Sequence, residues 1–131
     1  MNMERNQGIQ FLSREEIRAY QEKRMAEALD YVSKNSPFYS KLFSDNHIDI
    51  SKIRTLDDLS CIPVTTKPDL QSRNQDFICV PPSEIVDYPT TSGTLGDPVT
   101  FAETESDLEH LAYTEFLSFS TAGCTRDDII Q

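Results

Sequence analysis

The patterning of apolar residues changes once along the chain, near Ile85, and this change constrains the fold more than any other feature. Before that point, capping residues and apolar positions recur at helical spacing. After it, short runs of β-branched residues flank a loop that contains glycine. The sequence therefore predicts a mainly helical lead-in at residues 1–83, followed by the beginning of an α/β subdomain at residues 84–131.

The lead-in begins with a long helix, predicted from about Arg14 to Asn35. Ser13 and Glu16 have the spacing of a capping box, which satisfies free N–H groups at a helix start. An apolar stripe follows at helical spacing: Ile17, Tyr20, Met25, Ala28, Leu29 and Val32. Ser36-Pro37 then predicts the start of a second helix with an aromatic face, and Asn46 is its expected left-handed end.

Shorter turns are predicted after this helix pair. Residues 55–59 have the pattern of one capped helical turn. Thr66 and Asp69 have the capping spacing of another short helix. Between Gln71 and Pro82 the signals weaken, and we expect mostly loop.

The α/β segment is predicted to contain strands at residues 85–88 and 99–102, with the glycine-containing loop between them. Thr104 and Asp107 are expected to cap a helix that ends at Ala122-Gly123. Its expected apolar face consists of Leu108, Leu111, Ala112, Phe116 and Phe119. Asp128 is expected to open a further strand, which gives a βαβ pattern. Since such a strand needs neighbours, we interpret the chain as part of a larger sheet.

Charge excludes several classes of function. The 131 residues carry 12 basic and 22 acidic side chains, a net charge of −10. Residues 84–131 hold most of that excess, with Arg126 as their single basic residue. This acidity repels nucleic acid and anionic membrane surfaces, so we expect neither as a partner.

Cysteine and histidine usage points to no metal or disulfide chemistry. Cys61, Cys79 and Cys124 are widely spaced and show no zinc-ligand pattern. His47 and His110 are isolated in the sequence. No apolar run approaches the length needed to span a membrane, and the polar start has no secretory core. We therefore expect a cytoplasmic protein with reduced thiols and no metal site.

Residues 90–98 read Thr-Thr-Ser-Gly-Thr-Leu-Gly-Asp-Pro and carry the clearest chemical signal. Successive N–H groups in such a turn can form a nest for phosphate oxygens, with hydroxyl donors beside them. The segment is not a Walker A loop, because it lacks the lysine and joins two predicted strands. Composition alone leaves a flexible hairpin turn as an equal alternative.

Three further pieces give this loop a context. They are Ser36-Pro37-Phe38-Tyr39, Leu56-Asp57-Asp58-Leu59 and the run from Ile62 to Leu70. In order and spacing they resemble the N-terminal portion of adenylate-forming enzymes of the phenylacetate–CoA ligase type. Residues 90–98 resemble the phosphate-binding motif of those enzymes. The resemblance implies an α/β fold, incomplete here, in which a helical segment precedes the first strands and helix of the large domain.

The resemblance also implies a function. It assigns ATP-phosphate contact to Thr91, Ser92, Gly93, Thr94 and Gly96, and Pro98 would close the loop. ATP with Mg²⁺ would activate a carboxylic acid as an acyl-adenylate, and CoA would then accept the acyl group. Leu95 departs from the motif, which usually has a hydroxyl there; its loss costs on the order of 1 kcal/mol if that hydroxyl touches phosphate. No catalytic or metal-binding residue can be placed within the chain, so we expect it to be inactive alone.

Other interpretations stay open at this point. Acyl-protein synthetases and adenylating enzymes of capsule biosynthesis look similar over this region, so the acyl acceptor and the acid are undecided. A truncated, non-catalytic interaction module is an alternative of another class, and exposed surfaces of a fragment could self-associate. The reading frame beyond Gln131 separates these alternatives: downstream adenylation motifs favour the enzyme, and a natural stop favours the module.

Overall fold

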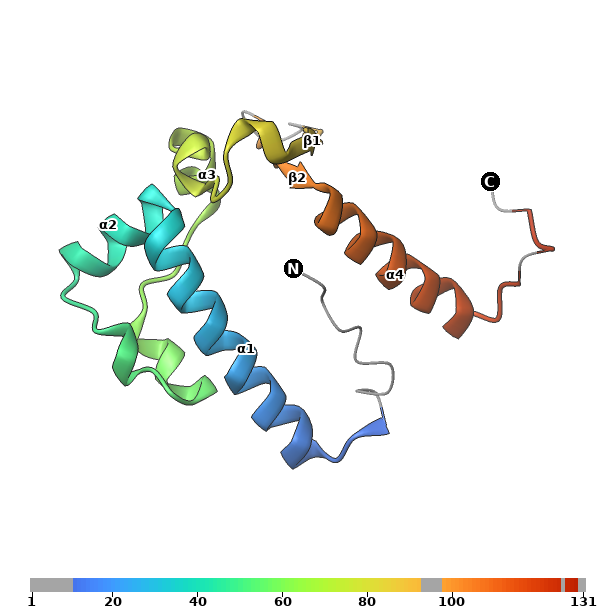
Figure 1. Cartoon of the computed structure of the whole chain (residues 1–131), viewed down its shortest axis with the longest axis horizontal. Helices are drawn as coiled ribbons and strands as arrows, with labels where there is room; N and C mark the ends of the chain where they lie inside the picture. Colours follow the sequence, from blue (N-terminus) through green and yellow to red (C-terminus); the bar gives the residue numbers. More distant parts are fainter. Residues whose placement is uncertain (1–10, 93–97, 126, 130–131) are drawn as a thin grey trace. The chain divides into compact units, whose positions relative to one another are not determined.

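The computed structural model describes residues 11–92, 98–125 and 127–129. It divides the chain into two compact units, Met1–Cys79 and Val80–Gln131, and Figure 1 shows the helices and strands of each. The first unit is helical, whereas the second holds a small sheet and one long helix. None of the helices in the described ranges is long and apolar enough to cross a membrane. The roles expected for residues 1–83 and 84–131 remain predictions.

The long helix α1 spans Arg14–Asn35, as predicted. The Ser13 hydroxyl accepts the Glu16 N–H at 3.3 Å, and the Glu16 carboxylate accepts the Ser13 N–H at 2.8 Å. Hydrogen bonds to the Glu16 carboxylate lower its pKa, from the backbone N–H of Ser13 first and from the Ser13 hydroxyl second. The apolar stripe is only partly covered: no residue of α1 is buried, and Ala28 is exposed.

A sharp corner at Ser36 joins α1 to α2, which spans Pro37–Asp45. Ser36 has extended backbone, and its N–H closes α1 by donating to the Val32 carbonyl at 3.0 Å. The helix α2 ends at Asp45, directly before Asn46, but the left-handed residue lies one position later than predicted. Asn46 keeps a negative φ, and His47 takes the left-handed conformation, with φ of 54°. Asn46 instead donates its side-chain amide to the Leu42 carbonyl, which fixes it within the helix end.

An aromatic cluster forms the centre of the first unit. The Phe38 ring stacks on Phe77 at a centroid distance of 4.1 Å, and Tyr39 meets Phe77 edge-on at 5.8 Å. The Arg73 guanidinium lies 4.9 Å from the centre of the Phe38 ring. Phe77 belongs to a 3₁₀ turn, η4 (Asn74–Phe77). The expectation of loop between Gln71 and Pro82 was therefore wrong here, because packing on Phe38 orders a segment whose local signals are weak.

Three short elements complete this unit: η2 (Ile50–Lys52), η3 (Leu56–Cys61) and α3 (Lys67–Ser72). The predicted capping boxes are present at the start of η3 and of α3. Arg18 of α1 pairs with Asp57 of η3 at 2.6 Å, and Glu22 accepts the Leu56 N–H at 3.3 Å. These bonds attach η3 to α1.

The second unit consists of the turn η5 (Pro82–Glu84), strands β1 (Ile85–Asp87) and β2 (Glu103–Thr104), and helix α4 (Glu105–Thr121). The two strands pair antiparallel, with Asp87 opposite Glu103 and an irregularity towards Ile85. The predicted strand at 99–102 is replaced by β2 and a single isolated bridge, Thr90 to Thr100. Pro89 has no N–H to donate, so the ladder cannot continue regularly past it.

Helix α4 begins and ends as predicted. Thr104 and Asp107 form a capping box, and Gly123 has φ of 86° after the C-cap residue Ala122. No residue of α4 is buried, so its expected apolar face is not a core face within the described residues. The strand expected at Asp128 was wrong for residues 127–129: the Asp128 carboxylate accepts the Thr125 N–H at 2.6 Å in a local turn. The described part of the chain therefore holds a hairpin and a helix, not a βαβ unit.

Candidate functional site

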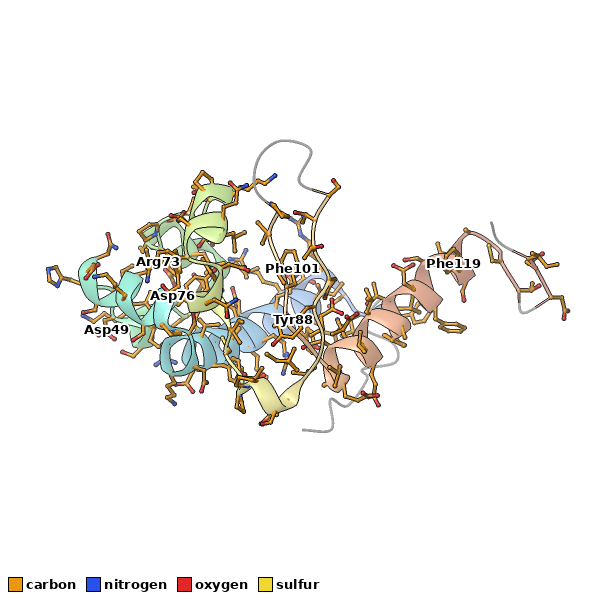
Figure 2. The ribbon with its side chains drawn as sticks, turned by 90° about the horizontal axis from the view of Figure 1, so that it is seen from above. Asp49, Arg73, Asp76, Tyr88, Phe101 and Phe119 are labelled. Atoms are coloured by element: carbon orange, nitrogen blue, oxygen red, sulfur yellow. The ribbon has the colours of Figure 1, made fainter. Side chains whose placement is uncertain are left out.

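The loop with the strongest sequence signal sits on a paired base, which we call the neck (residues 89–91 and 99–101). Phe101 donates its N–H to the Pro89 carbonyl at 2.9 Å, and Thr91 donates to the Val99 carbonyl at 3.0 Å. These bonds continue the register in which Asp87 lies opposite Glu103. Figure 2 shows Tyr88 and Phe101 on the two segments that lead to the loop. The neck thus holds the two ends of residues 92–98 side by side.

The structure describes two of the five predicted phosphate contacts. Thr91 and Ser92 are exposed at the start of the loop. Gly93, Thr94 and Gly96 lie outside the described residues, so their expected contacts stay predictions. Pro98 is described and exposed at the other end of the loop, directly before the buried Val99. The predicted site is therefore anchored at both ends by described residues.

A side-chain bond within the neck was not expected from the sequence. The Val99 N–H donates to the Thr91 hydroxyl oxygen at 3.0 Å. Val99 itself is 3% exposed, so its N–H needs a partner within the protein. No spacing rule predicts that a threonine side chain takes this bond from a position eight residues away, and we find no sequence signal that could have revealed it.

The residues with described placement form no metal-binding group. No group of three or more His, Cys, Asp or Glu side chains suited to hold a metal occurs there. The three cysteines are free thiols: Cys61 is exposed, and Cys79 and Cys124 are partly covered. Burial raises the pKa of the Cys79 thiol.

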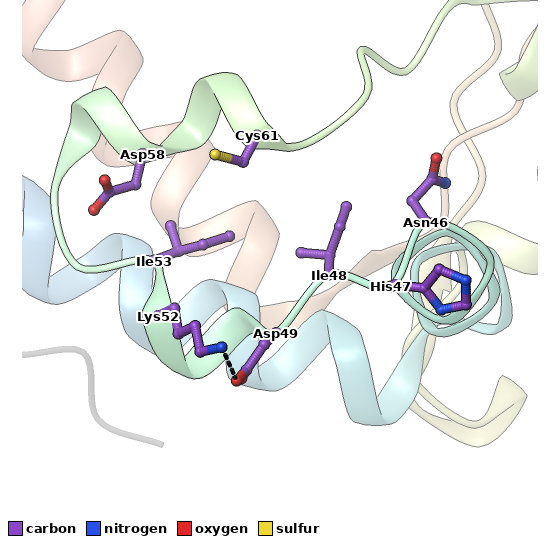
Figure 3. A pocket seen from close by; sticks show the side chains of 8 residues that line it. All are labelled: Asn46, His47, Ile48, Asp49, Lys52, Ile53, Asp58 and Cys61. Carbon is purple, nitrogen blue, oxygen red and sulfur yellow. Dashed lines mark ion pairs between the residues drawn. The ribbon is translucent and has the colours of Figure 1, made fainter.

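A pocket of about 340 Å³ in the first unit is lined by residues 46–49, 52, 53, 58 and 61. Figure 3 shows its ion pair, Lys52 with Asp49 at 3.6 Å. The carboxylate of Asp58 accepts the Arg54 N–H at 2.9 Å and both the N–H and the hydroxyl of Thr55. These bonds, with that to Arg54 first, lower the pKa of Asp58. The two carboxylates of this pocket, Asp49 and Asp58, thus bond within local turns, and we take the neck as the candidate site.

Comparison with known proteins shows which enzymes the chain is similar to. The chain is 34% identical over 116 residues to a phenylacetate–coenzyme A ligase from Thermus thermophilus, an alignment that covers 88% of the chain. It is 31% identical over 123 residues, 93% of the chain, to the enzyme of that name from Escherichia coli K12. This chain is a relative of phenylacetate–CoA ligases. No model of a protein family matches it.

A solved structure supports the fold. The chain matches 2-hydroxyisobutyryl-CoA ligase, crystallised with 2-HIB-AMP and CoA, with a TM-score of 0.72 and 27% identity. That match covers 79% of this chain and 23% of the crystallised one. The predicted fold class is thereby confirmed: a helical segment followed by part of the α/β domain of such ligases. The chain spans 26% and 28% of the length of the two ligases from Thermus and Escherichia.

Proposed function

We propose that this chain is the N-terminal portion of an AMP-forming carboxylate–CoA ligase and supplies its ATP-phosphate loop, residues 90–98. The relationship to phenylacetate–CoA ligases supports the class of reaction. The single structural observation that supports the role is the neck, in which Thr91 and Val99 hold the loop ends together. Successive N–H groups in a turn can form a nest for phosphate oxygens, and the neck holds the two ends of such a turn together.

The loop would act by position and electrostatics. In the first step a substrate carboxylate oxygen attacks the α-phosphorus of ATP, and pyrophosphate leaves. The loop N–H groups and hydroxyls would hold the phosphates in line and stabilise charge on their oxygens. In the second step the CoA thiolate attacks the acyl carbonyl and AMP leaves. Mg²⁺ would neutralise phosphate charge when bound, and we assign no ligand for it within this chain.

The charge of the second unit supports a shared site. Residues 84–131 contain one basic residue, Arg126, and ten acidic ones. A triphosphate needs cationic partners or a metal ion to offset its charge. We therefore expect the isolated chain neither to bind ATP tightly nor to form acyl-adenylate, and the remaining part of a ligase to supply those partners.

The test joins this chain to the region of the Thermus ligase that its alignment does not cover. Pyrophosphate release from ATP with phenylacetate measures adenylation, and phenylacetyl-CoA formation from the preformed adenylate measures the second step. We expect both activities in the joined protein and neither in the 131-residue chain. Thr94→Ala should slow adenylation more than thioester formation. Equal slowing of both steps, or turnover by the isolated chain, would contradict the proposal.

A further inference from the structure

The bonds between Thr91 and Val99 differ from those of a regular antiparallel pair. In such a hydrogen-bonded pair, two opposite residues exchange two N–H to carbonyl bonds. Here the Thr91 N–H donates to the Val99 carbonyl at 3.0 Å, as in a regular pair. The return bond from the Val99 N–H goes to the Thr91 hydroxyl oxygen at 3.0 Å. A side chain thus occupies the place of a backbone carbonyl at the last pair before the loop.

This substitution has a consequence for the path of the chain. A carbonyl that remained in the ladder would hold the backbone after Thr91 in the extended direction. Because the hydroxyl closes the pair instead, the Thr91–Ser92 peptide is released from the ladder while the neck stays shut. Val99 is 3% exposed, so water cannot readily replace the hydroxyl as a partner for its N–H. Loss of this hydroxyl should therefore loosen the neck itself.

We propose that Thr91 is a positioning residue of the phosphate loop, which acts through the Val99 N–H and fixes where the loop leaves the neck. This inference rests on the proposed function and assigns Thr91 a task other than the direct phosphate contact implied by the family resemblance. The hydroxyl oxygen accepts the Val99 N–H within the protein at 3.0 Å.

Hydrogen exchange of the Val99 amide in the 131-residue chain, measured by NMR without nucleotide, tests the bond directly. Thr91→Val keeps the shape of the side chain and removes the acceptor, so exchange at Val99 should become about ten- to a hundredfold faster. Thr91→Ser should restore slow exchange. Thr90→Val is the matched control, since it removes an exposed hydroxyl one position away in the same hairpin. Unchanged Val99 exchange in Thr91→Val would overturn the proposal.

A second measurement tests the role in catalysis, with the joined protein described above. Thr91→Val should lower the rate of adenylation, Thr91→Ser should recover it, and the loss should accompany the faster Val99 exchange seen without nucleotide. An unchanged adenylation rate in Thr91→Val would overturn the positioning role. Absence of activity in the unsubstituted joined protein would instead count against the proposed function, and the exchange measurement would still decide whether Thr91 closes the neck.

Discussion

Ser36 joins α2 to the turn η4 through its side-chain hydroxyl. It is 1% exposed and makes two bonds with its hydroxyl. The oxygen accepts the Tyr39 N–H at 3.3 Å and so caps α2. The hydroxyl hydrogen is donated to the Asp76 carbonyl at 2.9 Å, forty positions along the chain. Ser36→Ala removes both bonds and leaves the backbone and the packing volume almost unchanged.

The expected cost follows from these two bonds. Loss of an N-cap side chain costs about 1 kcal/mol. A partly buried carbonyl that loses its donor costs about 1–2 kcal/mol more. We therefore expect Ser36→Ala to lower the free energy of unfolding by about 2–3 kcal/mol. In a unit of this size that corresponds to a fall in Tm of about 8–24 °C.

Thermal unfolding followed by far-UV circular dichroism measures this effect, and Ser72→Ala is the matched control. The Ser72 hydroxyl donates to the Pro68 carbonyl at 2.8 Å on an exposed helix, and such a bond contributes little to stability. The control should change the free energy of unfolding by less than about 0.5 kcal/mol. If Ser36→Ala is as mild as Ser72→Ala, the reasoning that joins α2 to η4 through Ser36 is refuted.

Three further outcomes are expected. The pKa of Glu16 is lower in the folded protein than its ordinary value of 4.5, so the bonds to its carboxylate stabilise α1 above pH 4.5 and are lost as the pH falls through the lower folded pKa. The helical signal at 222 nm should therefore decrease on acidification. Glu16→Gln, which caps at any pH, should show a smaller decrease, and an equal one would exclude this cause. Phe77→Ala should destabilise the unit by about 2–3 kcal/mol in urea unfolding, while Phe77→Leu costs less, because the stacked ring fills space beside Phe38. Iodoacetamide should modify the exposed Cys61 before Cys79. Burial raises the pKa of the Cys79 thiol, which also donates to the Phe77 carbonyl, so this thiol should react more slowly. Peptide mass spectrometry that finds Cys79 modified first would contradict this.

Local signals predicted the helix boundaries well, and particular residues explain why. A capping box acts over three residues, so Ser13 with Glu16 and Thr104 with Asp107 specify their helix starts without help from tertiary contacts. The proline after Ser36 likewise sets the start of α2. The left-handed residue was misplaced by one position, because Asn46 and His47 both tolerate such a turn and the Asn46 amide bonds back to Leu42.

Strand positions were predicted less well, since pairing depends on a partner. Residues 99–102 have a strand-like pattern, but Pro89 opposite Phe101 lacks the N–H that regular pairing needs. Residues 127–129 pair with no strand in the part of the chain that the structure describes, and the Asp128 carboxylate accepts the nearby Thr125 N–H instead. The turn η4 was missed because its order comes from the Phe77 ring against Phe38, a contact between positions far apart in sequence.

The sequence by itself determined where the capped helices begin and showed the relationship to the ligases, and it predicted the candidate loop at residues 90–98. Caps, glycines and hydroxyl clusters act over a few residues, and their spacing is visible in one dimension. Only the tertiary structure decided that Ser36 joins α2 to Asp76 and that the Thr91 hydroxyl holds the Val99 N–H. Such bonds form where folding leaves a donor or acceptor without a backbone partner. Which groups lack a partner depends on the folded structure and cannot be read from the sequence.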